Sequence, residues 1–94
     1  MAGQSEPPRF RISVTPHFQR RARRLTSAEQ RALARALLIF QQDPRDPRLH
    51  THKLLGEHAD KLAFSFGYDS RVVFLWDAEV AVLLDVGTHD EVYG

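Results

Sequence analysis

The chain has 94 residues, a net charge of +1, 43% hydrophobic and 27% charged residues, and no cysteine. These values are typical of one soluble globular domain, here residues 1–94. The absence of cysteine excludes a disulfide framework, a thiolate nucleophile and a cysteine-ligated metal. No apolar run approaches the roughly 20 residues that span a bilayer, and residues 1–8 lack the apolar centre of a signal peptide. We therefore expect a cytoplasmic protein with no membrane attachment.

The charge is unevenly divided along the chain. Residues 1–60 carry eleven Lys or Arg and six Asp or Glu, a balance of +5, whereas residues 61–94 carry two and six, a balance of −4. This asymmetry predicts a basic surface that attracts phosphate groups or an acidic partner, although the total charge is close to zero.

The N-terminal part of the chain predicts a strand followed by a basic helix. We expect residues 1–8 to form a flexible arm. Residues 10–14 alternate between apolar and polar side chains, which predicts a strand with one buried face. Thr15 and Pro16 suit the N-cap and first position of a helix that extends to Leu25. The basic side chains of this helix are Arg20, Arg21, Arg23 and Arg24.

A second helix follows at once. Thr26 and Glu29 have the spacing of a capping box, with Thr26 as the N-cap. Apolar side chains then recur at helical spacing up to Phe40. Asp43-Pro44 ends the helix, because proline disfavours helical backbone in the residue before it.

Three strands complete the chain. Residues 62–67, 71–76 and 80–86 are separated by short turns, which predicts an antiparallel meander. The order is therefore β-α-α-β-β-β. It belongs to the α+β class, with a helical hairpin packed on one face of an antiparallel sheet.

Side-chain alternation predicts which residues of these strands are buried. On the middle strand we expect Phe74 and Trp76 to share a face and to lie in the core. On the last strand the expected buried face consists of Val80, Val82, Leu84 and Val86.

After the last strand the sequence becomes polar. Gly87 permits a bend or bulge there. His89 and Tyr93 are four residues apart, which is one helical turn, so they face the same way if the tail forms a helix. Both side chains donate or accept protons, and histidine does so near neutral pH. This pair is the first candidate for catalysis.

Three of the five histidines, His50, His52 and His58, fall within nine residues. Histidine ligates zinc, but His50-x-His52 is not a common ligand spacing and no cysteine completes it. We therefore expect no metal and no cofactor, and solvent-exposed positions for His50 and His58.

Three segments carry a resemblance to a known family: residues 52–56 (HKLLG), 66–74 (FGYDSRVVF) and 87–93 (GTHDEVY). With their order and the chain length, they resemble the RelE/ParE superfamily of type II toxin–antitoxin toxins, most closely the RelE/YafQ-like mRNA interferases. The resemblance implies an endoribonuclease that enters the ribosomal A site and cuts mRNA without a metal. It also implies a cognate antitoxin that wraps around the toxin, silences it and mediates any contact with operator DNA.

The resemblance also assigns roles to residues. Attack of an RNA 2′-OH on the adjacent phosphate needs a base, positive charge and an acid. Matched by motif position, the catalytic candidates are His89 and His52 for proton transfer, Tyr93 for proton transfer or base stacking, Asp69 as the acid at a strand start, and Arg71 for phosphate charge. Lys53 is a second cation candidate. Neighbours on a strand point to opposite faces, which argues against both His52 and Lys53 serving.

The chain departs from the family pattern at three places. Many relatives carry an arginine where this chain has Ser65, an aromatic residue where it has Ser70, and a tryptophan within residues 59–63. The resemblance therefore implies a phosphate site with less positive charge, in which catalysis depends more on histidines.

Two other functions fit the same sequence. A ParE-like gyrase inhibitor shares the fold but generally lacks the pattern of residues 87–93. A catalytically degenerate toxin that acts as an antitoxin-binding co-repressor is favoured by Ser65. The basic residues 20–24 form either a solvated helix face, a contact for ribosomal RNA phosphates, or a docking site for an acidic antitoxin segment.

Overall fold

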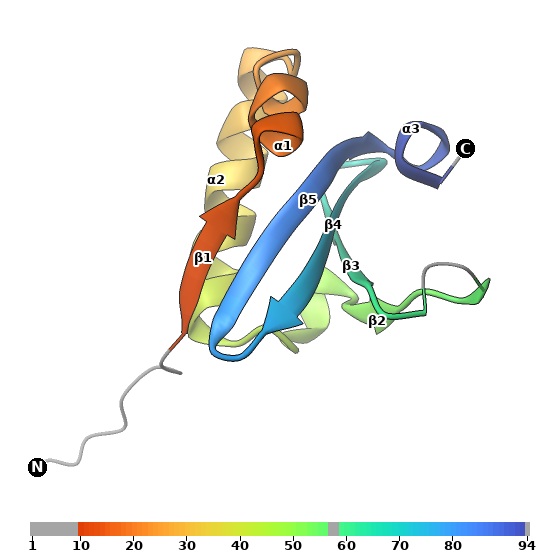
Figure 1. Cartoon of the computed structure of the whole chain (residues 1–94). Helices are drawn as coiled ribbons and strands as arrows, with labels where there is room; N and C mark the ends of the chain where they lie inside the picture. Colours follow the sequence, from red (N-terminus) through yellow and green to blue (C-terminus); the bar gives the residue numbers. More distant parts are fainter. Residues whose placement is uncertain (1–9, 57–58, 94) are drawn as a thin grey trace, which may run out of the picture.

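The computed structural model describes residues 10–56 and 59–93 of the chain. The expected N-terminal arm, residues 1–8, and His58 lie outside the described residues. In chain order the elements are β1 (Arg11–Val14), α1 (Pro16–Ala22), α2 (Ser27–Gln42), the 3-10 helix η1 (Pro47–Leu49), β2 (His52–Lys53), β3 (Leu62–Phe66), β4 (Ser70–Asp77), β5 (Val80–Thr88) and α3 (His89–Tyr93). The α+β class is confirmed, and the structure adds η1, β2 and α3 to the predicted elements (Figure 1). No helix in the described part of the chain is long and apolar enough to cross a bilayer.

The strands form one sheet in the order β1-β5-β4-β3-β2. β3, β4 and β5 form the predicted antiparallel meander, and β2 extends it at one edge. β1 pairs with β5 in parallel, so the sheet is mixed. Parallel neighbours need a long connection between them, and here that connection contains α1, α2 and the other three strands. The sequence predicts β1 and β5 as strands but not their parallel pairing.

Both predicted helix starts are confirmed. At α1, the Thr15 hydroxyl oxygen accepts a hydrogen bond from the Phe18 amide at 3.0 Å. At α2, Thr26 Oγ1 accepts from the Glu29 amide at 3.1 Å, and Glu29 Oε1 accepts from the Thr26 amide at 2.8 Å. α2 ends where the Asp-Pro step predicts, whereas α1 ends earlier than predicted, at Ala22.

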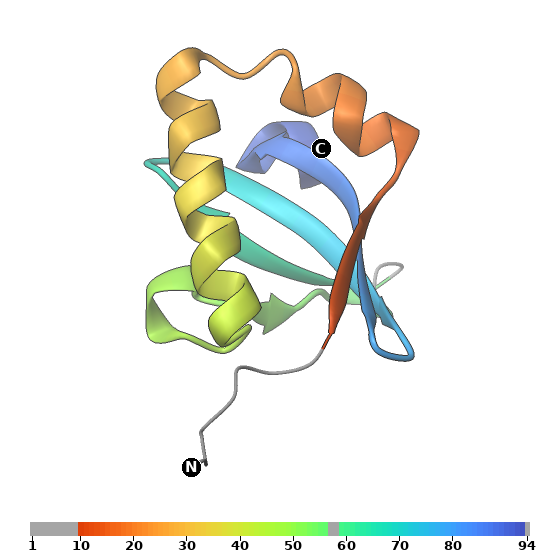
Figure 2. The same cartoon turned by 90° about the vertical axis from the view of Figure 1, so that its left-hand side faces the viewer.

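α2 lies across one face of the sheet (Figure 2), and the aromatic core is packed between them. Phe40 of α2 is 0% exposed, and its ring centroid lies 4.8 Å from that of Phe64 and 4.9 Å from that of Phe74. Trp76 was predicted to be a core residue, but it is 40% exposed. It lies near the end of β4, where its ring packs on Phe10 at 5.2 Å and covers the margin of the core.

The predicted buried face of β5 is wrong in its register. The residues of β5 whose side chains are buried in the core are Ala81, Leu83 and Val86, not the predicted set of Val80, Val82, Leu84 and Val86. Val73 of β4 pairs with Asp85, but the next pair along β4 moves to Leu83, which leaves Leu84 as the extra residue of a β-bulge. The bulge reverses the alternation, so that Asp85 and Gly87 lie on the face opposite the core.

Candidate functional site

α3 follows β5 directly and carries the predicted pair His89 and Tyr93. Their ring centroids lie 4.5 Å apart, with the rings edge to face at 78°. The tail does form a helical turn, and the two side chains then face the same way, as their spacing of four residues predicts. α3 packs against β4 and β5, on the side of the sheet away from α2 (Figure 1).

His89 and Tyr93 line a pocket with residues of the edge strand β2. The pocket has a volume of about 380 Å³, and its walls are His52, Lys53, Leu54, Leu55, His89 and Tyr93. Two histidines and two further predicted site residues thus come together from segments far apart in the sequence. His52 and Lys53 line the same pocket, against the expectation. Both side chains of the two-residue strand β2 are exposed, and β2 is an edge strand among the described residues, so one pocket reaches both of them.

The ring of His52 has a defined hydrogen-bonding role. Its Nδ1 lies 2.9 Å from the backbone carbonyl oxygen of His50. A carbonyl only accepts hydrogen bonds, so Nδ1 carries a proton, and in the neutral ring Nε2 keeps a free lone pair. His50 directs its carbonyl this way because its backbone is left-handed, with φ of 53°, at the end of η1. Its side chain is exposed, as expected.

The second histidine has an acidic neighbour. Nδ1 of His89 lies 3.6 Å from Oδ1 of Asp90, whose side chain is exposed. Within residues 10–56 and 59–93, no three His, Asp or Glu side chains are grouped as the ligands of a metal ion would be.

Tyr93 lines the pocket, and its hydroxyl group is buried. This hydroxyl has no hydrogen-bond partner among the described residues. Burial raises the pKa of Tyr93 above its usual 10.0, and the positive charge of Arg71 offsets part of this increase. An unpaired buried polar group costs about 1–3 kcal/mol.

We expect the Tyr93 ring to titrate above pH 10, because its anion loses hydration on burial. Replacing Arg71 with glutamine should raise the pKa further, since a cation that favours the anion is removed. An NMR titration measures both values, and a Tyr68→Phe background leaves Tyr93 as the only tyrosine, since the chain has two. A midpoint at or below about 10 would contradict the burial of the hydroxyl.

The fold can be compared with known proteins. No family model matches the sequence, and no curated protein matches it. YafQ from E. coli strain BL21(DE3) is similar in structure, with a TM-score of 0.69 at 14% identity over 92% of this chain and 100% of YafQ. A copper-bound mutant toxin from Helicobacter pylori gives 0.70 at 20% identity over 90% and 100% of the two chains. The toxin–antitoxin complex RelBE2 from Mycobacterium tuberculosis gives 0.61 at 21% identity over 85% and 98%. The chain has the RelE/YafQ toxin fold.

In this RelE/YafQ fold, Arg71 lies on the sheet face that α3 covers. It pairs with Ser65 on β3 and with Gly87 on β5. Its Nη1 donates to the carbonyl oxygen of Ser70 at 3.1 Å. Arg71 therefore supplies positive charge directly beside Ser65, the position at which the family resemblance implies an arginine.

Asp69 lies outside the pocket formed by β2 and α3. It is exposed in the turn between β3 and β4, and it lines a separate hollow with Ala28 and Ala32 of α2. The structure does not bring it together with His52 and His89. A catalytic role for Asp69 stays a prediction.

The four arginines at residues 20–24 differ in their surroundings. Arg20, Arg23 and Arg24 are exposed. Arg21 is 24% exposed, and its Nη2 lies 3.7 Å from Oε1 of Glu91 on α3. Arg21 is thus engaged with a carboxylate of the protein. Phosphate binding by these arginines stays a prediction.

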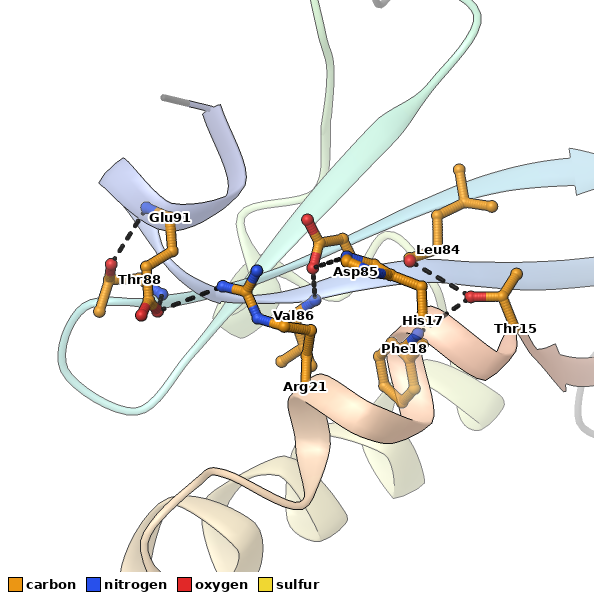
Figure 3. Close-up of polar contacts among 9 residues, drawn as sticks. All are labelled: Thr15, His17, Phe18, Arg21, Leu84, Asp85, Val86, Thr88 and Glu91. Carbon is orange, nitrogen blue, oxygen red and sulfur yellow. Dashed lines mark hydrogen bonds and ion pairs between the residues drawn. The ribbon is translucent and has the colours of Figure 1, made fainter.

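α1 is attached to the second half of β5 by polar contacts (Figure 3). The Thr15 hydroxyl donates to the Leu84 carbonyl oxygen at 3.3 Å. His17 Nε2 lies 3.2 Å from Asp85 Oδ1, which also accepts from the Val86 amide at 2.8 Å. The His17–Asp85 contact was not predicted, because no local signal in the sequence indicates a pair so far apart in the chain.

Helix α3 was not predicted either, although the sequence contains a capping-box pattern at its start. Thr88 and Glu91 repeat the capping-box spacing of Thr26 and Glu29. In the structure the Thr88 amide donates to Glu91 Oε1 at 2.8 Å, and the Glu91 amide donates to Thr88 Oγ1 at 3.2 Å. This spacing could have predicted both the existence and the start of α3.

Proposed function

We propose that this protein is the toxin of a type II toxin–antitoxin system and that it cleaves mRNA on the ribosome, which inhibits translation in the cytoplasm. The observation that carries the proposal is the pocket that holds His52, Lys53, His89 and Tyr93. It combines two histidines that can act as base and acid with the positive charge of Lys53, and these are the groups that RNA cleavage by a 2′-OH requires. The shared fold with toxins such as YafQ supports it.

The proposed reaction is an in-line transfer at phosphorus. A base takes the proton of the 2′-OH, O2′ forms a bond to phosphorus, and the bond from phosphorus to O5′ breaks as an acid protonates O5′. The products are a 2′,3′-cyclic phosphate and a 5′-hydroxyl. Lys53 and Arg71 stabilise the negative charge that develops on the phosphate oxygens.

We assign the base to His52 and the acid to His89. The carbonyl of His50 occupies the Nδ1–H of His52, so Nε2 of the neutral ring accepts a proton. His89, whose Nδ1 lies beside the Asp90 carboxylate, carries the proton for the leaving oxygen. Tyr93 is neutral at physiological pH and holds the His89 ring edge to face.

The proposal includes a protein partner, an antitoxin. RelBE2, one of the similar structures, is described as a toxin–antitoxin complex. DinJ–YafQ from E. coli is described in the same way, as a toxin–antitoxin complex. Any contact with operator DNA runs through the antitoxin.

The test is cleavage of a defined mRNA on programmed ribosomes, with ribosome-free RNA in parallel. We expect discrete cuts in the A-site codon that depend on the ribosome and disappear in His89→Ala. His50→Asn is the matched control, because His50 does not line the pocket and asparagine tolerates its left-handed backbone. If the wild type cuts nothing but inhibits DNA supercoiling by gyrase, the ParE-like alternative replaces this proposal.

A further inference from the structure

α3 holds two proposed site residues but is too short to be stable alone. It has five residues, His89–Tyr93, whereas isolated helices below roughly 12 residues are marginal in water. The position of His89 and Tyr93 therefore depends on whatever attaches α3 to the rest of the fold.

One carboxylate oxygen makes two of these attachments. Oε1 of Glu91 accepts the Thr88 amide at 2.8 Å, which caps the helix, and it lies 3.7 Å from Nη2 of Arg21 on α1 (Figure 3). Glu91 thus connects the start of α3 to a helix that is itself attached to β5 through His17 and Asp85.

The backbone of β5 fits closely against this ion pair. A Cβ atom on Gly87 would lie 2.6 Å from Glu91 Oε1 and 2.9 Å from Arg21 Nη2. Both atoms are the far ends of their side chains and are packed against the strand. Glycine at this position leaves the space in which the carboxylate and the guanidinium meet.

We propose that Glu91 and Arg21 are positioning residues, whose ion pair fixes α3 so that His89 and Tyr93 face His52 across the pocket. Neither Glu91 nor Arg21 lines that pocket, so their effect on the reaction is indirect. The expected effect on kcat rests on the proposed RNA cleavage. The hydrogen bond from the Thr88 amide, together with the positive charges of Arg21 and Arg24, holds the pKa of Glu91 below its usual value, so the carboxylate is charged at neutral pH.

The first experiment compares Glu91→Gln with the wild type. Glutamine keeps the shape and an oxygen for the Thr88 amide, but it removes the charge that attracts Arg21. We expect kcat to fall by at least about tenfold with little change in KM, because small misplacements of catalytic groups cost up to ~10²-fold. Glu79→Gln, an exposed residue of the β4–β5 turn, is the matched control.

A double-mutant cycle tests the pairing itself. Arg21→Gln should reduce kcat as Glu91→Gln does, and the double variant should be no worse than either single variant, because one interaction is lost in all three. Arg31→Gln on the exposed face of α2 is the control for loss of an arginine. Independent losses that multiply in the double variant would overturn the pairing.

Gly87→Ala provides an independent disruption of the same contact. Only the ends of two flexible side chains and the Glu91 Cβ, at 3.1 Å, need to move, so we expect a small loss of stability. The displaced carboxylate should nevertheless reduce kcat as strongly as Glu91→Gln does. Wild-type kcat in Gly87→Ala would contradict the proposal.

A structural readout separates this proposal from the proposed function. In the wild type the edge-to-face contact at 4.5 Å should give a nuclear Overhauser effect between the His89 and Tyr93 rings and ring-current shifts of the His89 protons. Glu91→Gln should weaken both, while the resonances of core residues such as Phe40 stay unchanged. If the wild type cuts no RNA, this measurement still tests the positioning. Unchanged ring signals in Glu91→Gln would refute the positioning even if the wild type is active.

Discussion

We expect the His89→Ala variant to cut mRNA on programmed ribosomes about 10²–10⁴-fold more slowly than the wild type, because a positioned general acid contributes a factor of that size. The chain should stay folded, since His89 is exposed and lies in the last helix. The melting temperature measured beside the cleavage rate should therefore change little. A rate within a few-fold of the wild type would move the acid to another residue.

The leaving group distinguishes the roles of the two histidines. In an RNA with sulfur in place of the bridging 5′-oxygen, the leaving thiolate needs no acid, because thiols have a pKa near 8.5. His89→Ala should recover most of its activity on this substrate. His52→Ala should not, because the 2′-OH still needs a base. Rescue of His52→Ala instead of His89→Ala would reverse the two assignments.

Local chemistry made the helix starts predictable from the sequence. The capping box at Thr26 and Glu29 and the N-cap at Thr15 depend on hydrogen bonds between residues three apart. Such contacts are encoded in a short window and hold in the structure. The same three-residue spacing at Thr88 and Glu91 predicts the start of α3 in the same way.

The register of β5 was not predictable in the same way. Alternation favoured a buried face that includes Val82 and Leu84, but the bulge at Leu84 is set by pairing with β4. Bulges of this kind are defined by two strands together and cannot be inferred from one. Without the bulge, Gly87 would lie on the core face and could not leave space for Glu91 and Arg21.

The site was predicted in part. His52, His89 and Tyr93 came from the family resemblance, and the structure brings all three to one pocket. Their convergence depends on β2 joining the edge of the sheet opposite β1, which composition and periodicity do not reveal. Arg21 looked like one of four equivalent surface cations, because the sequence could not show that a distant carboxylate would face it.

The largest effect on stability should come from Phe40. This residue is 0% exposed and its ring contacts those of Phe10, Phe64 and Phe74. Phe40→Ala should lower the free energy of unfolding by about 3–5 kcal/mol, because it removes buried apolar area and leaves a cavity. Since domains of this size are stable by only about 5–15 kcal/mol, the variant should be close to unfolding at physiological temperature.

Urea unfolding of Phe40→Ala and of Leu38→Ala gives a matched comparison on one helix. Leu38 is 65% exposed, so its replacement should change the free energy of unfolding by no more than about 0.5 kcal/mol. The melting temperature of Phe40→Ala should fall by at least about 12 °C, since 1 kcal/mol corresponds to roughly 4–8 °C in a domain of this size. Equal losses for the two variants would show that α2 does not bury Phe40 against the face of the sheet.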